Sequence, residues 1–142
     1  MEYKNIVVAV DGSQASEKAF KKSLDIAKRN HARLILAHVV DSRTFASAEA
    51  YDRTLSERAD SYAKELLDTY AENARSVGVT DLVRSVAYGS PKVKIAKDIA
   101  QDFDADLIIC GAKGMSAVER FLIGSVSESI TRYATCDVLV VR

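Results

Sequence analysis

Short apolar runs alternate along this chain with longer stretches in which apolar residues recur every three or four positions. Residues 6–10 and 34–40 are β-branched apolar runs bounded by polar residues, which predicts strands. Similar runs predict strands at residues 106–110 and 137–141, and a weaker pattern predicts one within residues 82–88. Helical spacing fills the intervals, so strands and helices are expected to alternate.

The first two predicted helices have start or stop signals. Ser13 is the expected N-cap of the first, Glu17 lies in its positively polarised first turn, and the helix is expected to end near Asn30. Gly78 is expected to end the second helix. The apolar face is predicted as Ala19, Phe20, Leu24 and Ala27 in the first helix, and as Tyr51, Leu55, Ala59, Tyr62, Leu66, Tyr70, Ala74 and Val77 in the second.

Two more helices are predicted in the second half of the chain. Ser90 is expected to cap a helix with Pro91 in its first turn. The buried face of that helix is predicted as Ala96, Ile99, Ala100 and Phe103. The last helix is expected at residues 125–134.

Strands that alternate with helices predict an α/β fold, with residues 1–142 forming a single domain. The expected architecture is a doubly wound, five-stranded parallel sheet of order 3-2-1-4-5 with helices on both faces, a Rossmann-like arrangement. In that order the first and fourth strands are neighbours, and a ligand crevice opens at their carboxyl ends. Asp11 and Gly111 follow these two strands, so both are expected at the crevice.

Composition and charge narrow the class of protein. Hydrophobic residues make up 48% of the chain, and 20 basic residues balance 20 acidic ones, so no net charge draws it to nucleic acid. No apolar run approaches the roughly 20 residues that span a bilayer, and the first residues do not resemble a secretory signal, which predicts a cytoplasmic protein. Cys110 and Cys136 adjoin strands and lack partners at metal-ligand spacing.

The segment after the fourth predicted strand has the composition of a phosphate cradle. Gly111, Gly114 and Gly124 allow close backbone approach to an anion, and Ser125 begins a helix whose first N–H groups are unpaired. Alternatively, each glycine forms an ordinary turn and Ser125 only caps the helix. The spacing of all four residues favours phosphate binding.

This spacing, Gly-x2-Gly-x9-Gly-Ser, resembles the signature of the ATP-binding subgroup of the universal stress protein family. The resemblance covers nearly the whole chain and includes four other segments in family order. These are residues 8–13 (VAVDGS), 36–40 (LAHVV), 89–91 (GSP) and 136–142 (CDVLVVR). It implies a cytoplasmic stress-response or regulatory protein that binds ATP, with Mg or Mn held through the phosphates, and at most hydrolyses it slowly.

The resemblance also implies roles for residues at the crevice. Asp11 would accept hydrogen bonds from the ribose, although an Asx turn or helix cap is the alternative reading of Asp11-Gly12-Ser13. Ala9 and Val39 would offer main-chain groups, those of Val39 to the adenine edge.

The phosphates would be held after the fourth strand. Backbone N–H groups of Gly114, Gly124, Ser125 and Val126 are the implied donors, with the hydroxyls of Ser125 and Ser127 close by. Lys113 either places a positive charge over the phosphates or projects into water. Residues 116–123 either fold over the nucleotide as a flap or form a helical turn.

The last predicted strand would lie at the edge of the sheet. Residues 138–141 are apolar, so an exposed edge there would invite pairing with a second copy, and similar proteins dimerise through this strand. The alternative is a monomer in which this edge is covered. No membrane or nucleic-acid partner is expected.

Two other functions are alternatives to an ATP-binding homodimer. An adenylyl transferase or ATP pyrophosphatase on a related fold would carry a His-x-Gly-His or Ser-Gly-Gly-x-Asp-Ser motif, and residues 11–14 (DGSQ) form neither. A nucleotide-free dimeric scaffold would lack the glycine series. No nucleophile paired with a base is evident, so the chain is expected to be a binding module without catalytic residues.

Overall fold

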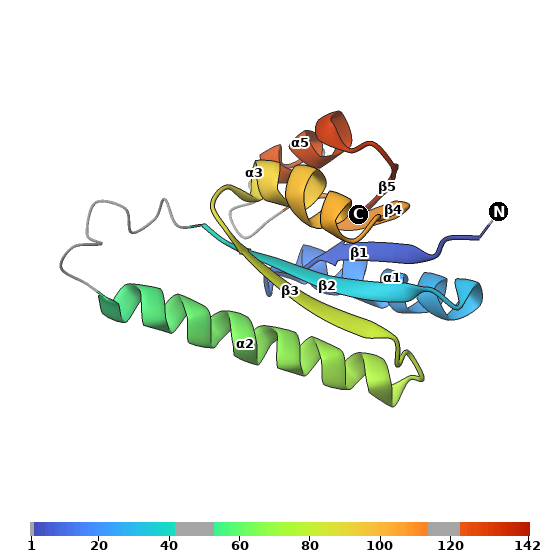
Figure 1. Cartoon of the computed structure of the whole chain (residues 1–142), viewed down its shortest axis with the longest axis horizontal. Helices are drawn as coiled ribbons and strands as arrows, with labels where there is room; N and C mark the ends of the chain where they lie inside the picture. The colour runs from blue at the N-terminus through green and yellow to red at the C-terminus, as the bar shows by residue number, and fades with distance from the viewer. Residues whose placement is uncertain (1, 42–52, 114–122) are drawn as a thin grey trace.

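The computed structural model describes residues 2–41, 53–113 and 123–142. Its strands form one parallel sheet in the order β3-β2-β1-β4-β5, which confirms the predicted topology (Figure 1). The strands are β1 (Asn5–Ala9), β2 (Arg33–Val40), β3 (Leu82–Tyr88), β4 (Leu107–Gly111) and β5 (Asp137–Val141). Each begins within one residue of its predicted start.

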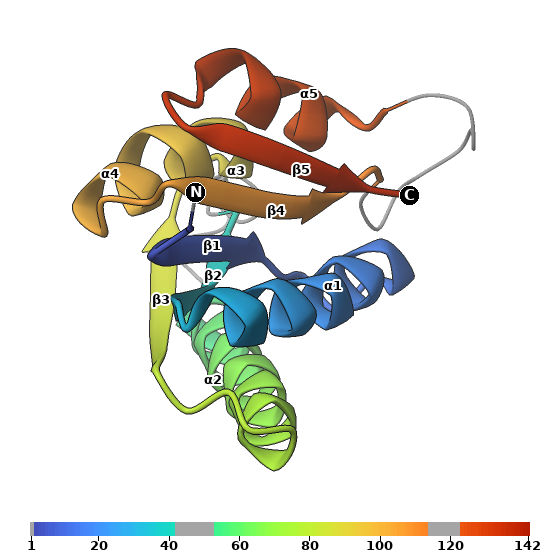
Figure 2. The same ribbon diagram turned by 90° about the vertical axis from the view of Figure 1, so that its right-hand side faces the viewer.

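Helices cover both faces of the sheet, so the fold has three layers (Figure 2). One face is covered by α1 (Gln14–Asn30) and α2 (Arg53–Ser76). The other is covered by α5 (Ser125–Tyr133) and by a continuous helical segment made of α3 (Pro91–Val93), the π-helical turn η2 (Lys94–Ile99) and α4 (Ala100–Asp102). The sequence did not predict the π-helical turn.

The core consists of two apolar clusters, one on each face. Residues of the central strands alternate between them: Val8 and Leu36 pack toward α1 and α2, whereas Val7 and Ile35 pack toward η2 and α5. All four side chains are fully buried. The continuous apolar runs in the sequence therefore reflect strands that are covered on both faces.

The predicted ends of α1 are confirmed, whereas the predicted cap at Ser90 has the right position but lacks its side-chain hydrogen bond. The Ser13 hydroxyl accepts from the Ser16 N–H at 3.1 Å, so Ser13 is the N-cap, and the helix ends at Asn30. Pro91 occupies the first turn of α3 as expected, but Ser90 makes no side-chain cap hydrogen bond. The fixed φ of Pro91, not a hydroxyl cap, starts this helix.

The predicted apolar face of α2 is partly wrong. Tyr70 and Ala74 are buried as expected, but Leu55, Tyr62 and Val77 are exposed by 39%, 47% and 45%. The buried positions are Ala63, Leu67, Tyr70, Ala71 and Ala74. The buried face is therefore displaced by about one residue from the predicted one, and three of its five positions are alanine.

Candidate functional site

The carboxyl ends of β1 and β4 lie side by side at the centre of the sheet, where the winding direction reverses (Figure 2). Asp11 follows β1, Lys113 follows β4, and α5 begins at Ser125. This is the position at which open α/β sheets bind ligands. Gly114 and most of the predicted flap fall in residues 114–122, outside the described residues.

Asp11 forms the Asx turn that was the alternative to ribose binding. Its Oδ1 accepts from the Ser13 N–H at 2.9 Å, and its own N–H donates to the Ser16 hydroxyl at 3.2 Å. The carboxylate is half-buried, and Oδ2 has no hydrogen-bond partner within residues 2–41, 53–113 and 123–142. One carboxylate oxygen therefore holds the turn, and the other is available to a ligand.

Val39 lies just beyond the end of the β1–β2 ladder. The last paired residues are Ala9 and Ala37, and the Val10 N–H donates to the Ala37 carbonyl at 2.9 Å. Main-chain polar groups alternate in direction along a strand, so those of Val39, like those of Ala37, are directed toward the β1 side. Val39 and Ala9 therefore lie near the carboxyl ends of β2 and β1, and the binding of a nucleotide by their main chains stays a prediction.

The start of α5 offers unpaired N–H donors. Gly124 is its N-cap and supplies no side chain, and the intrahelical bonds begin with the Glu128 N–H, which donates to the Gly124 carbonyl at 3.0 Å. The N–H groups of Ser125 and Val126 lie in the first turn and have no intrahelical acceptor. The Gly124 N–H donates to the Ala112 carbonyl at 2.6 Å, so this amide is engaged within the protein.

Ser127 links α5 to β4, a role that the sequence did not suggest. Its hydroxyl is buried and donates to the Gly111 carbonyl. Burial raises the pKa of the neighbouring Cys110 thiol to about 11, although a hydrogen bond with Ser127 partly opposes this effect. The Ser127 proton is thus used in packing, and Cys110 is a neutral core residue.

Gly111 is required by packing at this position. A Cβ built on it would lie 2.7 Å from the backbone carbon and oxygen of Ala15 and 2.8 Å from the Ala15 Cβ. These distances are far below normal contact, so only glycine lets β4 and α1 approach this closely. Lys113, two residues further on, is half-buried, and its role stays a prediction.

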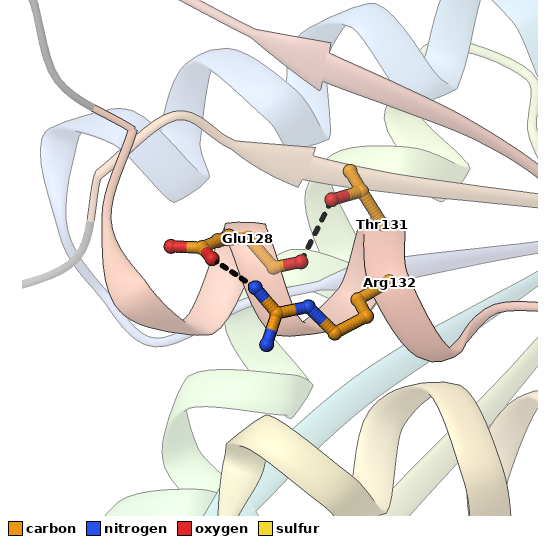
Figure 3. Close-up of polar contacts among 3 residues, drawn as sticks. All are labelled: Glu128, Thr131 and Arg132. Atoms are coloured by element: carbon orange, nitrogen blue, oxygen red, sulfur yellow. Dashed lines mark hydrogen bonds and ion pairs between the residues drawn. The ribbon is translucent and has the colours of Figure 1, made fainter.

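The acidic residue in the first turn of α5 is neutralised within the helix. Glu128 pairs with Arg132 one turn along, and Thr131 donates to the Glu128 carbonyl at 2.7 Å (Figure 3). This exposed pair contributes little to stability. It does place a positive charge beside the only carboxylate of the first turn, which reduces its repulsion of an anion at the helix start.

Sequence reasoning gave no role in the site to two residues that lie near the carboxyl end of β1. His38 (β2) and Tyr62 (α2) both contact the main chain where β1 ends. Their rings meet edge to face with centroids 6.0 Å apart. The topology left open a place for His38 at the end of the second strand, and Tyr62 was expected on the apolar face of the second helix, so no spacing in the sequence linked the two.

The described part of the chain contains neither a metal-ligand cluster nor a membrane-spanning helix. No three His, Cys, Asp or Glu side chains in residues 2–41, 53–113 and 123–142 are placed to hold a metal ion. The same residues include no helix that is both long and apolar enough to cross a bilayer. The polar groups at the crevice are mainly backbone N–H groups and one carboxylate.

Known proteins share both the sequence and this fold. Residues 2–142 match the universal stress protein family, and the chain belongs to that family. A putative universal stress protein of Staphylococcus haemolyticus is 51% identical over 142 residues, which is 100% of this chain and 86% of that protein.

Solved structures show the same architecture. The universal stress protein UspA from Lactobacillus plantarum has a TM-score of 0.89 and 32% identity, with 100% of this chain and 99% of that chain covered. A universal stress protein in complex with cAMP has a TM-score of 0.73 and 27% identity, with 100% and 98% covered.

Proposed function

We propose that this chain is an ATP-binding regulatory protein of the stress response, a binding module with at most slow ATP hydrolysis. The observation that carries this proposal is the α5 N-terminus, which has no side-chain cap and is held at the end of β4, next to the reversal point of the sheet, by the hydrogen bond from the Gly124 N–H to the Ala112 carbonyl. Unpaired N–H groups and the helix dipole favour a phosphate there. The cAMP complex of a relative with 27% identity supports an adenine nucleotide as the ligand.

Each part of the nucleotide has a candidate partner in the crevice. The N–H groups of Ser125 and Val126 would bind phosphate oxygens. The Gly114 N–H and the positively charged side chain of Lys113 would bind the phosphates as well. The free Oδ2 of Asp11 would accept from the ribose, and the main chain of Val39 would pair with the adenine edge. A Mg or Mn ion would take its ligands mainly from the phosphates.

We further propose a homodimer formed through β5. This strand is at one edge of the sheet, and its four valine and leucine residues are only half-buried. An antiparallel twofold pairing would cover both edges at once. The cytoplasmic location predicted from the sequence belongs to the same proposal.

Isothermal titration with ATP and with cAMP tests the nucleotide proposal. Replacing both Gly114 and Gly124 with valine puts branched side chains where the backbone must approach the phosphates, so we expect ATP binding to be lost. Thr131→Val is the matched control, because it adds a valine to α5 on the helix shown in Figure 3, beyond the first turn. Unchanged ATP affinity in the folded double variant would refute the phosphate site.

A further inference from the structure

Two consecutive carbonyls at the end of β1 accept hydrogen bonds from side chains of other elements. His38 Nδ1 lies 2.8 Å from the Val10 carbonyl oxygen, and the Tyr62 hydroxyl donates to the Asp11 carbonyl at 3.3 Å. A carbonyl can only accept, so Nδ1 of His38 carries the proton. Residues from β2 and α2 therefore fix the main chain where β1 leaves the sheet.

The local packing holds this arrangement in place. His38 is 8% exposed, and its ring meets that of Tyr62 edge to face at an interplanar angle of 65°. Between the two carbonyls and Ser13 lies Gly12, whose φ of +83° is unfavourable for other residues. A Cβ on Gly12 would collide with the Tyr62 hydroxyl, so the glycine also makes room for it.

The His38 contact changes what Val39 can do. The Val10 N–H donates to the Ala37 carbonyl. If the parallel ladder continued by one more bond, the Val10 carbonyl would accept from the N–H of Val39, two residues further along β2. In the structure His38 Nδ1 donates to that carbonyl, and the Val39 N–H does not. Among the described residues the Val39 N–H thus has no acceptor on the β1 side, where an acceptor atom on a base could meet it.

The Tyr62 contact fixes the neighbouring residue. It holds the carbonyl of Asp11, while the Ser13 and Ser16 contacts hold its carboxylate and its N–H. All three polar groups of Asp11 are thus oriented before any ligand arrives. Because Oδ1 is held, the position of Oδ2 at the end of β1 is fixed as well.

We propose that His38 and Tyr62 are positioning residues for nucleoside recognition: His38 keeps the Val39 N–H open to the base, and Tyr62 holds Asp11 for the ribose. Neither residue touches the phosphate side, which is built on β4 and α5. The inference rests on the proposed nucleotide function, and it predicts effects on the nucleoside part of the ligand alone.

Tyr62→Phe removes only the hydroxyl that donates to Asp11. We expect its ATP affinity to fall about threefold to tenfold, the usual effect of one lost hydrogen bond, while inorganic tripolyphosphate binds as it does to the wild type. Tyr88→Phe is the matched control, because Tyr88 is 53% exposed and donates to Asp60 of the same helix, away from β1. Equal ATP affinity in Tyr62→Phe and Tyr88→Phe would overturn the role of Tyr62.

His38 is tested by a pair of variants. Asparagine places its amide N–H near the position of Nδ1, so His38→Asn should retain the wild-type ATP affinity. His38→Leu has no donor there, and its ATP affinity should fall about tenfold. Tripolyphosphate affinity should be unchanged in both. If leucine lowers the melting temperature but leaves ATP affinity equal to that of the asparagine variant, His38 is only structural.

Hydrogen exchange separates this inference from the proposed function. In the ligand-free protein, the Ser13 amide, bonded to Asp11 at 2.9 Å, should exchange faster in Tyr62→Phe than in Tyr88→Phe. If the wild type binds no nucleotide, the proposed function and nucleoside positioning both fail, even where exchange shows that Tyr62 orders the turn. If the wild type binds ATP and exchange is equal in the two variants, only the positioning inference fails.

Discussion

Replacing Gly111 with alanine tests whether the first glycine of the family signature is required by the fold. The new Cβ would lie 2.7 Å from the Ala15 backbone carbon and oxygen. Optimal carbon contacts lie at about 3.5–4.0 Å, so β4 and α1 must separate by nearly 1 Å at a buried position. Overpacking of this kind costs about 1–3 kcal/mol of unfolding free energy.

Urea denaturation at pH 7 measures this loss directly. For a chain of this length we also expect the melting temperature to fall by roughly 4 °C per kcal/mol. Gly124→Ala is the matched control, because Gly124 has φ −64° and ψ 158°, which any residue adopts, and its replacement should cost less than about 1 kcal/mol. Adding Ala15→Gly should rescue Gly111→Ala only in part, since two of the three close contacts are with backbone atoms.

The reasoning fails if Gly111→Ala is as stable as the wild type within about 0.5 kcal/mol, the normal range for neutral surface substitutions. Loss of ATP binding at unchanged stability would also contradict it, because that result would assign the glycine to the ligand. A folded but destabilised Gly111→Ala that still binds ATP is the expected outcome.

Three further predictions follow from the site and the edge strand. Asp11→Asn can keep the Ser13 contact through its Oδ1, so it should retain the wild-type melting temperature. If a buried ribose contact is lost, calorimetry should show a loss of about 1–3 kcal/mol of ATP binding energy. Unchanged affinity would show that Asp11 only forms the turn. Val140→Pro should abolish the dimer in sedimentation while the protein stays folded. The Ala112 N–H donates to the Val141 carbonyl, so Val141 faces β4 and the preceding residue, Val140, directs its N–H to the open edge, where proline removes it. A folded proline variant that remains dimeric would refute this interface. Burial raises the pKa of Cys110 from 9.0 to about 11, so the folded state keeps this thiol protonated at a pH where the unfolded state loses the proton. The free energy of unfolding should therefore fall as pH rises from about 9 to 11. Cys110→Ala should lose less stability across this range, and an equal pH dependence in the two proteins would show that the thiol is not responsible.

The order of the sheet could be predicted from the sequence because strand and helix signals alternate without ambiguity. Asp137–Val141 was predicted with the observed bounds, and the third strand was predicted within the range that the observed Leu82–Tyr88 fills. The topology then brings Asp11 and Gly111 to neighbouring strand ends, which requires no knowledge of side-chain packing. The location of the candidate site is therefore predictable from local patterns and one topological rule.

The local chemistry could not be predicted in the same way. Ser127 was expected near the phosphates, but its hydroxyl donates to the Gly111 carbonyl, a contact that depends on how α5 docks on β4. Tyr62 was expected in the core, but a rotation of α2 brings its hydroxyl to Asp11. Such contacts join residues far apart in sequence, so no local pattern predicts them. In addition, hydrophobic periodicity predicts the buried face of a helix only to within about one residue.

The two sides of the crevice are positioned by different means. On the β4 side, the Gly111 and Ala112 carbonyls accept from Ser127 and Gly124, so two hydrogen bonds hold the start of α5 against the strand end without any ligand. The free N–H groups of Ser125 and Val126 are thus ordered before an anion binds, which reduces the entropic cost of binding. On the β1 side, the order depends on side chains from β2 and α2. Substitutions in α2 should therefore change nucleoside selectivity while phosphate binding is retained.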